Sequence, residues 1–215
     1  MMTSLLRRGA GALCALLSLG LAMITAGNAA AETPWERLAL PEGAVIEIPA
    51  DFRILSEKEV AGIASYAAGA AQRRQTRDPQ RRLLVANAGE PSWAVVRLSV
   101  FDSNRWNRED LLNATESELR DVRDYYLDYL PKALVRGQAR LREVYMPRIV
   151  TIAGHPALEI TYRRSSQFVV SDWLVRMYSI ETGAKKFLLT ISNDLSSADR
   201  MDPILNRILW TIEFN

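Results

Sequence analysis

Two carboxylates in the last third of the chain have the spacing of an acid–base pair. Glu159 and Asp172 lie on segments that we expect to be consecutive strands, where both side chains can face the same side of a sheet. Many hydrolases need only two carboxylates, one acting as general acid and the other as base or nucleophile. However, Arg163 and Arg176 lie on the same two segments, so cross-strand ion pairs explain all four residues without catalysis. An acid–base hydrolase using Glu159 and Asp172 is therefore an alternative hypothesis and not the favoured one.

The other residues that could do chemistry have ordinary structural explanations. The one histidine, His155, follows a turn glycine and precedes Pro156, so we interpret it as a turn residue. The sequence contains no G-x-S-x-G nucleophile elbow and no glycine-rich loop of the kind that cradles phosphates. Asp194, Asp199 and Asp202 precede or begin an expected helix, where capping is their usual role. We assign no catalytic, cofactor-binding or metal-binding residue and expect no cofactor.

The most charge-biased stretch, Gln72 to Arg82, contains five arginines and a single acid, Asp78. The five are Arg73, Arg74, Arg77, Arg81 and Arg82. Guanidinium groups bind phosphate and carboxylate with two parallel hydrogen bonds, so one hypothesis is a patch for an anionic partner such as anionic lipid or lipopolysaccharide. The other is a solvated connection whose charges keep the protein soluble, which the absence of interleaved aromatic residues favours.

The first 31 residues have the pattern of a secretory signal peptide. Arg7 and Arg8 form a charged start, an apolar run extends from Ala10 to Ile24, and Ala29 to Ala31 form a small-residue cleavage site. We predict cleavage between Ala31 and Glu32, and hence a periplasmic or secreted bacterial protein. An uncleaved membrane anchor is the alternative, but the apolar run is short for a span of about 20 residues.

Cleavage changes the charge and the cysteine content. Two of the 27 basic residues precede Glu32, whereas all 25 acidic residues follow Ala31, so the mature chain has no net charge. A protein that coats nucleic acid is not supported. The lone cysteine, Cys14, is also removed, so the mature chain forms no disulfide. Residues 32–215 are enough for one domain, since a domain of this size buries about 70% of its unfolded surface.

The elements that must position these side chains are predicted by alternation, helical spacing and turn residues. Glu32 to Pro41 is expected to be an extended lead-in. Expected strands are Ala44 to Ile48, Leu83 to Ala88, Trp93 to Phe101, Arg148 to Ile152, His155 to Tyr162, Val169 to Ile180, Phe187 to Ser192 and Trp210 to Phe214. Expected helices begin after Ser56, which forms a capping box with Glu59 and extends to about Ala71, after Asn107, and after Asp202 with Pro203 first.

The helix after Asn107 is expected to carry a buried stripe about 20 residues long and to lie across the sheet, because apolar residues recur at three- and four-residue steps. The stripe is Leu111, Thr115, Leu119, Val122, Tyr126 and Leu130. Pro131 is expected to end or kink this helix.

The order of these elements resembles the PsbP-like fold. The resemblance rests on the first strand with Ile48 to Phe52, the long helix, the Ile152 to Ala157 hairpin, the following meander and the ending from Ile204 to Phe214. This group includes the photosystem subunit PsbP, DcrB-type envelope proteins and LpqN-type lipoproteins. The resemblance implies a single α+β domain in which a central antiparallel sheet carries helices on its faces, as in an α/β/α sandwich.

The resemblance also bears on function. It implies a largely non-enzymatic group whose members bind proteins or small molecules and share no catalytic residues. This chain departs from the group in its arginine-rich segment and in lacking a lipid anchor. The favoured hypothesis is an exported, non-enzymatic binding or interaction domain of the cell envelope. Its partner is an envelope protein or a small ligand, peripheral membrane contact is left open, and oligomeric state is not readable from the sequence.

Overall fold

The computed structural model describes residues 33–60, 81–101, 107–135, 138–165, 170–183 and 185–215. The chain separates into two compact units, Met1–Thr33 and Pro34–Asn215, and the fold below is that of the second. The predicted signal peptide and its cleavage site at Ala31 and Glu32 lie outside the described residues, as do Arg73, Arg74 and Arg77. These assignments stay predictions.

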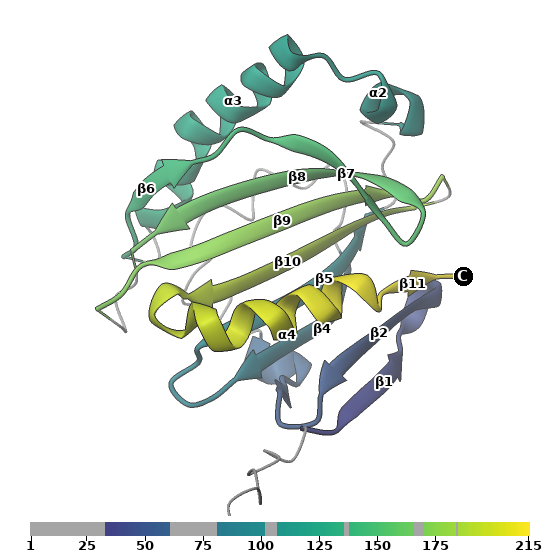
Figure 1. The fold of residues 1–215 in the computed structure, drawn as a ribbon, viewed down its shortest axis with the longest axis vertical. Helices are drawn as coiled ribbons and strands as arrows, with labels where there is room; N and C mark the ends of the chain where they lie inside the picture. The colour runs from purple at the N-terminus through teal and green to yellow at the C-terminus, as the bar shows by residue number, and fades with distance from the viewer. Residues whose placement is uncertain (1–32, 61–80, 102–106, 136–137, 166–169, 184) are drawn as a thin grey trace, which may run out of the picture. The chain divides into compact units, whose positions relative to one another are not determined.

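Among the described residues, eight strands form one antiparallel sheet in the order β3-β4-β5-β10-β9-β8-β6, with β7 paired to β8 (Figure 1). Their bounds are β3 Arg53–Ile54, β4 Arg81–Ala88, β5 Ala94–Phe101, β6 Leu141–Val144, β7 Arg148–Ile152, β8 His155–Arg164, β9 Trp173–Glu181 and β10 Lys186–Asp194. A smaller antiparallel sheet has the order β1-β2-β11. Its strands are β1 Trp35–Ala39, β2 Ala44–Pro49 and β11 Glu213–Phe214.

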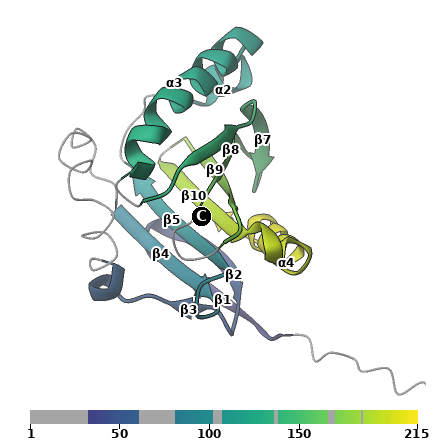
Figure 2. The same ribbon diagram turned by 90° about the vertical axis from the view of Figure 1, so that its left-hand side faces the viewer.

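Helices pack on both faces of the large sheet, as the sequence predicts for an α+β domain. The described helices are α2 Arg108–Leu112, α3 Glu116–Leu134 and α4 Ala198–Trp210, with short 3-10 turns η1 Pro41–Gly43 and η3 Leu195–Ser197. Residues 57–60 are also helical. We call the two sides of the large sheet the α4 face and the α3 face, after the helices that cover them (Figure 2).

The α4 face carries the larger core. Met201, Leu205 and Ile208 form the apolar stripe of α4 and are almost completely buried against the sheet and β2. Their sheet partners alternate along each strand, as a surface with one buried side requires. Each such buried side chain contributes about 1.5–3 kcal/mol relative to exposure. This core fixes α4 against β9 and β10.

The α3 face is built from the opposite alternation. Leu158, Ile160 and Tyr162 of β8 are buried beneath α2 and α3, as the alternation predicted. Leu111 and Leu130 are the buried ends of the predicted helical stripe. Consequently Ala157, Glu159 and Thr161 of the same strand point to the α4 face.

The predicted continuous helix after Asn107 is wrong in one respect, because it is interrupted between Leu112 and Glu116. Thr115 is the N-cap of α3 instead of a member of the buried stripe. Its hydroxyl accepts from the Glu118 amide at 3.3 Å, and its own amide donates to the Glu118 carboxylate at 2.8 Å. This capping box starts a new helix.

Pro131 was expected to end or kink this helix, and the expectation that it ends α3 is wrong. The helix continues to Leu134 although proline removes one backbone hydrogen bond. Leu130 and Leu134, on either side of the proline, pack in the same apolar cluster. The burial of this last turn offsets the lost bond.

The prediction that Asp202 caps the C-terminal helix is also wrong. Helix α4 begins five residues earlier than predicted, at Ala198, and contains Asp202 and Pro203. Asp194 caps the preceding 3-10 turn, since its Oδ1 accepts from the Ser196 amide at 2.8 Å. The early start buries Met201, which leaves Asp202 free for another role.

The strand boundaries at both ends of the domain also differ from the prediction. Trp210 ends α4 and is 71% exposed, so the final strand consists of Glu213 and Phe214 alone. At the other end, the expected extended lead-in is the strand β1, which pairs with β2. The capping box of Ser56 and Glu59 is present, while residues 61–71 of the expected helix lie outside the described residues.

Candidate functional site

A cleft of about 300 Å³ opens on the α4 face, where β7, β8 and β9 meet the connection between β6 and β7. Six side chains from these segments line it: Tyr145, Met146, Arg148, Glu159, Thr161 and Arg176. Strand register brings them together, because Arg148 pairs with Glu159 and Thr161 pairs with Arg176. The volume is at the lower end of the range of ligand sites in proteins, so a small ligand fits it best.

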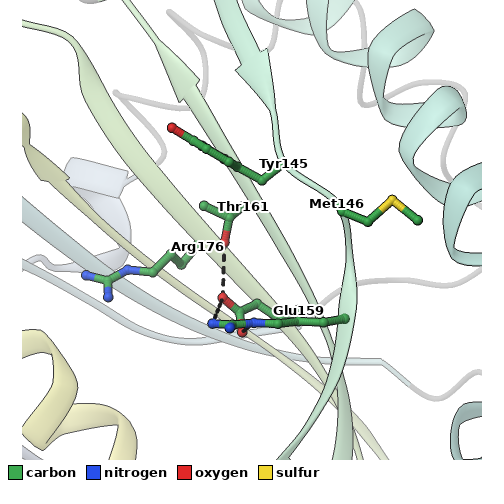
Figure 3. A pocket seen from close by; sticks show the side chains of 6 residues that line it. Tyr145, Met146, Glu159, Thr161 and Arg176 are labelled. Carbon is green, nitrogen blue, oxygen red and sulfur yellow. Dashed lines mark hydrogen bonds and ion pairs between the residues drawn. The ribbon is translucent and has the colours of Figure 1, made fainter. Parts of the chain in front are cut away.

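The floor of this cleft is a carboxylate held by two neighbours. Glu159 is 5% exposed, and its two oxygens accept from Arg148 Nε at 2.7 Å and Arg148 Nη2 at 3.0 Å. Thr161 Oγ1 donates to Glu159 Oε1 at 3.1 Å, as Figure 3 shows. The hydrogen bonds that Arg148 donates to Glu159, followed by the Glu159 charge, raise the pKa of Arg148 above its ordinary value. The Arg148 guanidinium therefore compensates the negative charge of Glu159.

Arg176 forms the wall of the cleft and connects it to α4. Its Nη2 donates to Asp202 Oδ1 at 2.9 Å and its Nη1 to Asn206 Oδ1 at 3.2 Å. Its Nε–H is buried and has no acceptor among the described residues. Buried polar groups nearly always have a hydrogen-bond partner, so an acceptor atom of a ligand would complete the hydrogen bonding of this nitrogen.

Two tyrosines in or near the cleft keep their protons near neutral pH. Tyr145 lies on the far side of Thr161 from Glu159 (Figure 3), and burial, followed by a hydrogen bond with Glu143, raises its pKa. Tyr178 is opposite Glu159 in the sheet, and burial followed by the Glu159 charge raises its pKa to about 12. Both hydroxyls therefore stay protonated near neutral pH and act as hydrogen-bond donors rather than as bases.

The structure does not bring the two carboxylates of the hydrolase hypothesis together. Asp172 is six residues along β9 from the partner of Glu159, which separates the two by about 20 Å at 3.3 Å per residue. Glycosidase carboxylates are at most about 10 Å apart. Asp172 instead forms ion pairs with Arg142 at 3.3 Å and Arg163 at 3.6 Å. The alternative hypothesis of an acid–base pair formed by Glu159 and Asp172 is therefore wrong.

Of the five arginines proposed as an anionic-partner patch, Arg81 and Arg82 are described. They point to opposite faces of β4, because Arg81 pairs with Val100 and Arg82 with Ser99. Arg81 forms an ion pair with Glu42. The patch as a whole stays a prediction.

Sequence reasoning missed most of the cleft, although one part was readable. The tight turn at Ala153 and Gly154 fixes the β7–β8 register, and counting back from it places Arg148 opposite Glu159. No comparable signal marks Tyr145 and Met146, which follow a short strand in a region for which no prediction was made. Arg176 was expected to pair across the strands, yet its partner is Asp202 on α4.

The described residues offer no arrangement for metal binding or for crossing the membrane with a helix. Within them, no group of three histidine, cysteine, aspartate or glutamate side chains is arranged to hold a metal ion. No described helix combines the length and apolarity needed to cross a membrane. His155 begins β8 and packs edge-on against Phe214 at 5.9 Å between ring centroids, which is a structural contact.

Comparison with solved structures identifies the class of fold. The chain is similar to cyanobacterial PsbP (CyanoP) from Synechocystis sp. PCC 6803, with a TM-score of 0.53 and 12% identity over 85% of this chain and 94% of that one. This likeness confirms the PsbP-like fold predicted from the sequence, and at such low identity it concerns the fold alone.

Two further solved structures align over similar lengths. LpqN of Mycobacterium tuberculosis, described as involved in cell envelope biogenesis, gives a TM-score of 0.44 and 13% identity over 85% of this chain and 91% of LpqN. The Ran-binding protein Mog1p of Saccharomyces cerevisiae gives 0.41 and 9% over 85% and 96%. No protein-family model matches the sequence, and no curated protein matches it significantly.

Proposed function

We propose that this protein is an exported, non-enzymatic domain that binds a small polar ligand in the cleft lined by Arg148, Glu159 and Arg176. The observation that carries this proposal is the buried Arg176 Nε–H at the wall of the cleft, a donor that has no acceptor in the part of the chain that the structure describes. A ligand oxygen at this position would satisfy it. Tyr145 and Met146 would supply contact area, because both are partly exposed at 38% and 42%.

The geometry favours binding over catalysis. Both oxygens of Glu159 are engaged by Arg148, and Thr161 adds a third bond, so the carboxylate has little freedom to exchange a proton with a substrate. Arg176 is likewise held by Asp202 and Asn206. A site whose charges are fixed by internal partners orients a ligand but offers no activated base or nucleophile.

Export and an envelope location rest on the sequence of residues 1–31, whose charged start, apolar run and alanine-rich end are typical of a signal peptide. The PsbP-like fold is compatible with this location.

The proposal is tested by exposing the purified protein to the small-molecule fraction of a cell-envelope extract and identifying retained compounds by mass spectrometry. We expect wild type to retain a compound that Tyr145→Ala loses. Tyr125→Ala is the matched control, because Tyr125 is exposed on α3 and lies outside the cleft. The compound should be recovered with its mass unchanged. Retention of nothing, or recovery of a chemically altered compound, would refute a non-enzymatic binding site.

A further inference from the structure

The opposite face of the sheet carries three arginines that strand register places on one side. Arg82 pairs with Ser99, and Arg97 lies two residues from Ser99 on β5, so their side chains are diagonal neighbours with Cα atoms about 7–8 Å apart. Both point to the α3 face, since Leu98 between Ser99 and Arg97 is in the core on the other side. Arg164 points to the same face as Tyr162, two residues before it. We call these three residues the arginine cluster.

This cluster differs from most of the other described arginines in having no carboxylate partner among the described residues. Most described arginines form ion pairs with carboxylates: Arg37, Arg53, Arg81, Arg120, Arg142, Arg148, Arg163, Arg176 and Arg207. No carboxylate of the described residues forms such a pair with Arg82, Arg97 or Arg164. Arg82 and Arg97 remain exposed to solvent.

The members of the cluster repel one another. Although Arg97 reaches solvent, the surrounding protein removes part of its hydration, and this is the largest cause of a lowered pKa. The charges of Arg82 and Arg164 lower the pKa of Arg97 further. Burial also lowers the pKa of Arg164. Like charges that have no carboxylate partner among the described residues favour the binding of an anion.

Trp173, the aromatic neighbour of Arg164, also has a polar group without a partner among the described residues. The Arg164 guanidinium lies 5.3 Å from the centroid of the Trp173 ring, and Trp173 is 6% exposed. The indole Nε1–H is buried and has no acceptor among the described residues. Cations and an unsatisfied donor thus occur together on this face, and all of them favour a group rich in acceptor oxygens.

We propose that Arg82, Arg97 and Arg164 form a binding site for a phosphate-bearing ligand on the α3 face of the sheet. Phosphate offers several acceptor oxygens and a charge of about −2, which matches several guanidinium forks. The phosphate belongs either to a soluble compound or to a lipid headgroup. This site is separate from the cleft, because Glu159 and Arg176 are on the α4 face, so each proposal can fail without the other.

The test uses two probes, inorganic pyrophosphate in calorimetric titration and vesicles of phosphatidylcholine with or without phosphatidylglycerol in sedimentation. We expect one probe or both to bind, and binding to weaken as salt is raised. Saturable pyrophosphate binding without sedimentation identifies a soluble phosphate compound. Sedimentation that requires phosphatidylglycerol and is inhibited by pyrophosphate identifies a lipid headgroup.

Arg97→Gln decides whether the cluster is responsible. Loss of one charged hydrogen-bonding group should weaken binding about tenfold or more. The control is Arg120→Gln, which removes an equal charge from an exposed ion pair on α3 and should bind like wild type. Failure of both probes to bind, unchanged binding by Arg97→Gln, or equal loss in both variants would overturn the proposal.

A second measurement tests the premise that no internal anion neutralises the cluster. Since Arg97→Gln relieves repulsion, its melting temperature should equal or exceed that of wild type in the absence of ligand. A clearly lower melting temperature would mean that Arg97 already has an anionic partner within the fold, and would overturn the proposal.

Discussion

Replacing Arg148 by methionine tests how the cleft is held together. The change keeps most of the apolar stem but removes two hydrogen bonds to Glu159, which is then buried with only Thr161 as partner. Breaking a fully buried ion pair costs about 3–5 kcal/mol. The Arg148 side chain is 70% exposed, so water can replace part of what is lost. We therefore expect the free energy of unfolding to fall by about 2 kcal/mol, less than the fully buried value.

Urea denaturation measures this change, and a thermal melt should show a decrease of about 4–8 °C for a domain of this size. The control Arg120→Met removes an exposed pair with Glu116 and should change stability by less than about 0.5 kcal/mol. The double variant Arg148→Met/Glu159→Leu should recover much of the loss, because it leaves no charge buried alone. If Arg148→Met is as stable as Arg120→Met, Glu159 is not held as the structure indicates.

Three further predictions concern the rest of the fold. Gly154→Ala, at φ +77° in open space, should cost about 1–2 kcal/mol, whereas Gly43→Ala should cost more because its Cβ would lie 2.5 Å from the last backbone carbonyl. Denaturation of both variants checks this. Thr115→Ala should remove about 1 kcal/mol by breaking the cap of α3, measured in the same way. A hydrogen bond from Lys185 lowers the pKa of Glu42, so its stabilisation is present above the ordinary value of 4.5 and is lost as the pH falls through the folded-state value. Glu42→Gln should therefore be less stable than wild type near neutral pH and equal to it in acid.

The strands and their turns were predictable because local chemistry determines them. Alternation in His155 to Tyr162 and the turn at Ala153 and Gly154 fixed both the hairpin and the face to which Glu159 points. The PsbP-like order of elements followed from the same signals and is confirmed by the likeness to CyanoP. The two-residue alternation of strands and the three- to four-residue spacing of helices are both visible in a single sequence.

The predictions that were wrong share a different cause. Asp202 and Pro203 have an ideal helix-start sequence, but the burial of Met201 and the cap at Asp194 outweighed that local preference. Glu159 and Asp172 lie on neighbouring strands, yet only the exact register shows that Asp172 is far away with Arg163 as its partner. A short stretch of sequence does not determine which residues tertiary packing buries or how distant strands align.

The cleft required contacts between distant segments. Arg176 on β9 meets Asp202 on α4, and the connection that carries Tyr145 covers β8 without any sequence signal. Helix α4 supplies the acceptors for both Nη nitrogens of Arg176, whereas its Nε–H has no acceptor among the described residues. Such a site emerges only when the helix is placed on the sheet.

The most direct test of the central claim is methyl NMR of the protein labelled at its methionine methyl groups, with the small-molecule fraction of an envelope extract added. Met146 lines the cleft and is 42% exposed, whereas Met201 is 2% exposed on the buried side of α4 and serves as an internal control. A ligand in the cleft predicts a saturable shift of the Met146 signal, an unchanged Met201 signal and loss of the effect in Tyr145→Ala. A Met146 signal that never moves, or moves equally in Tyr145→Ala, would contradict a binding site in this cleft.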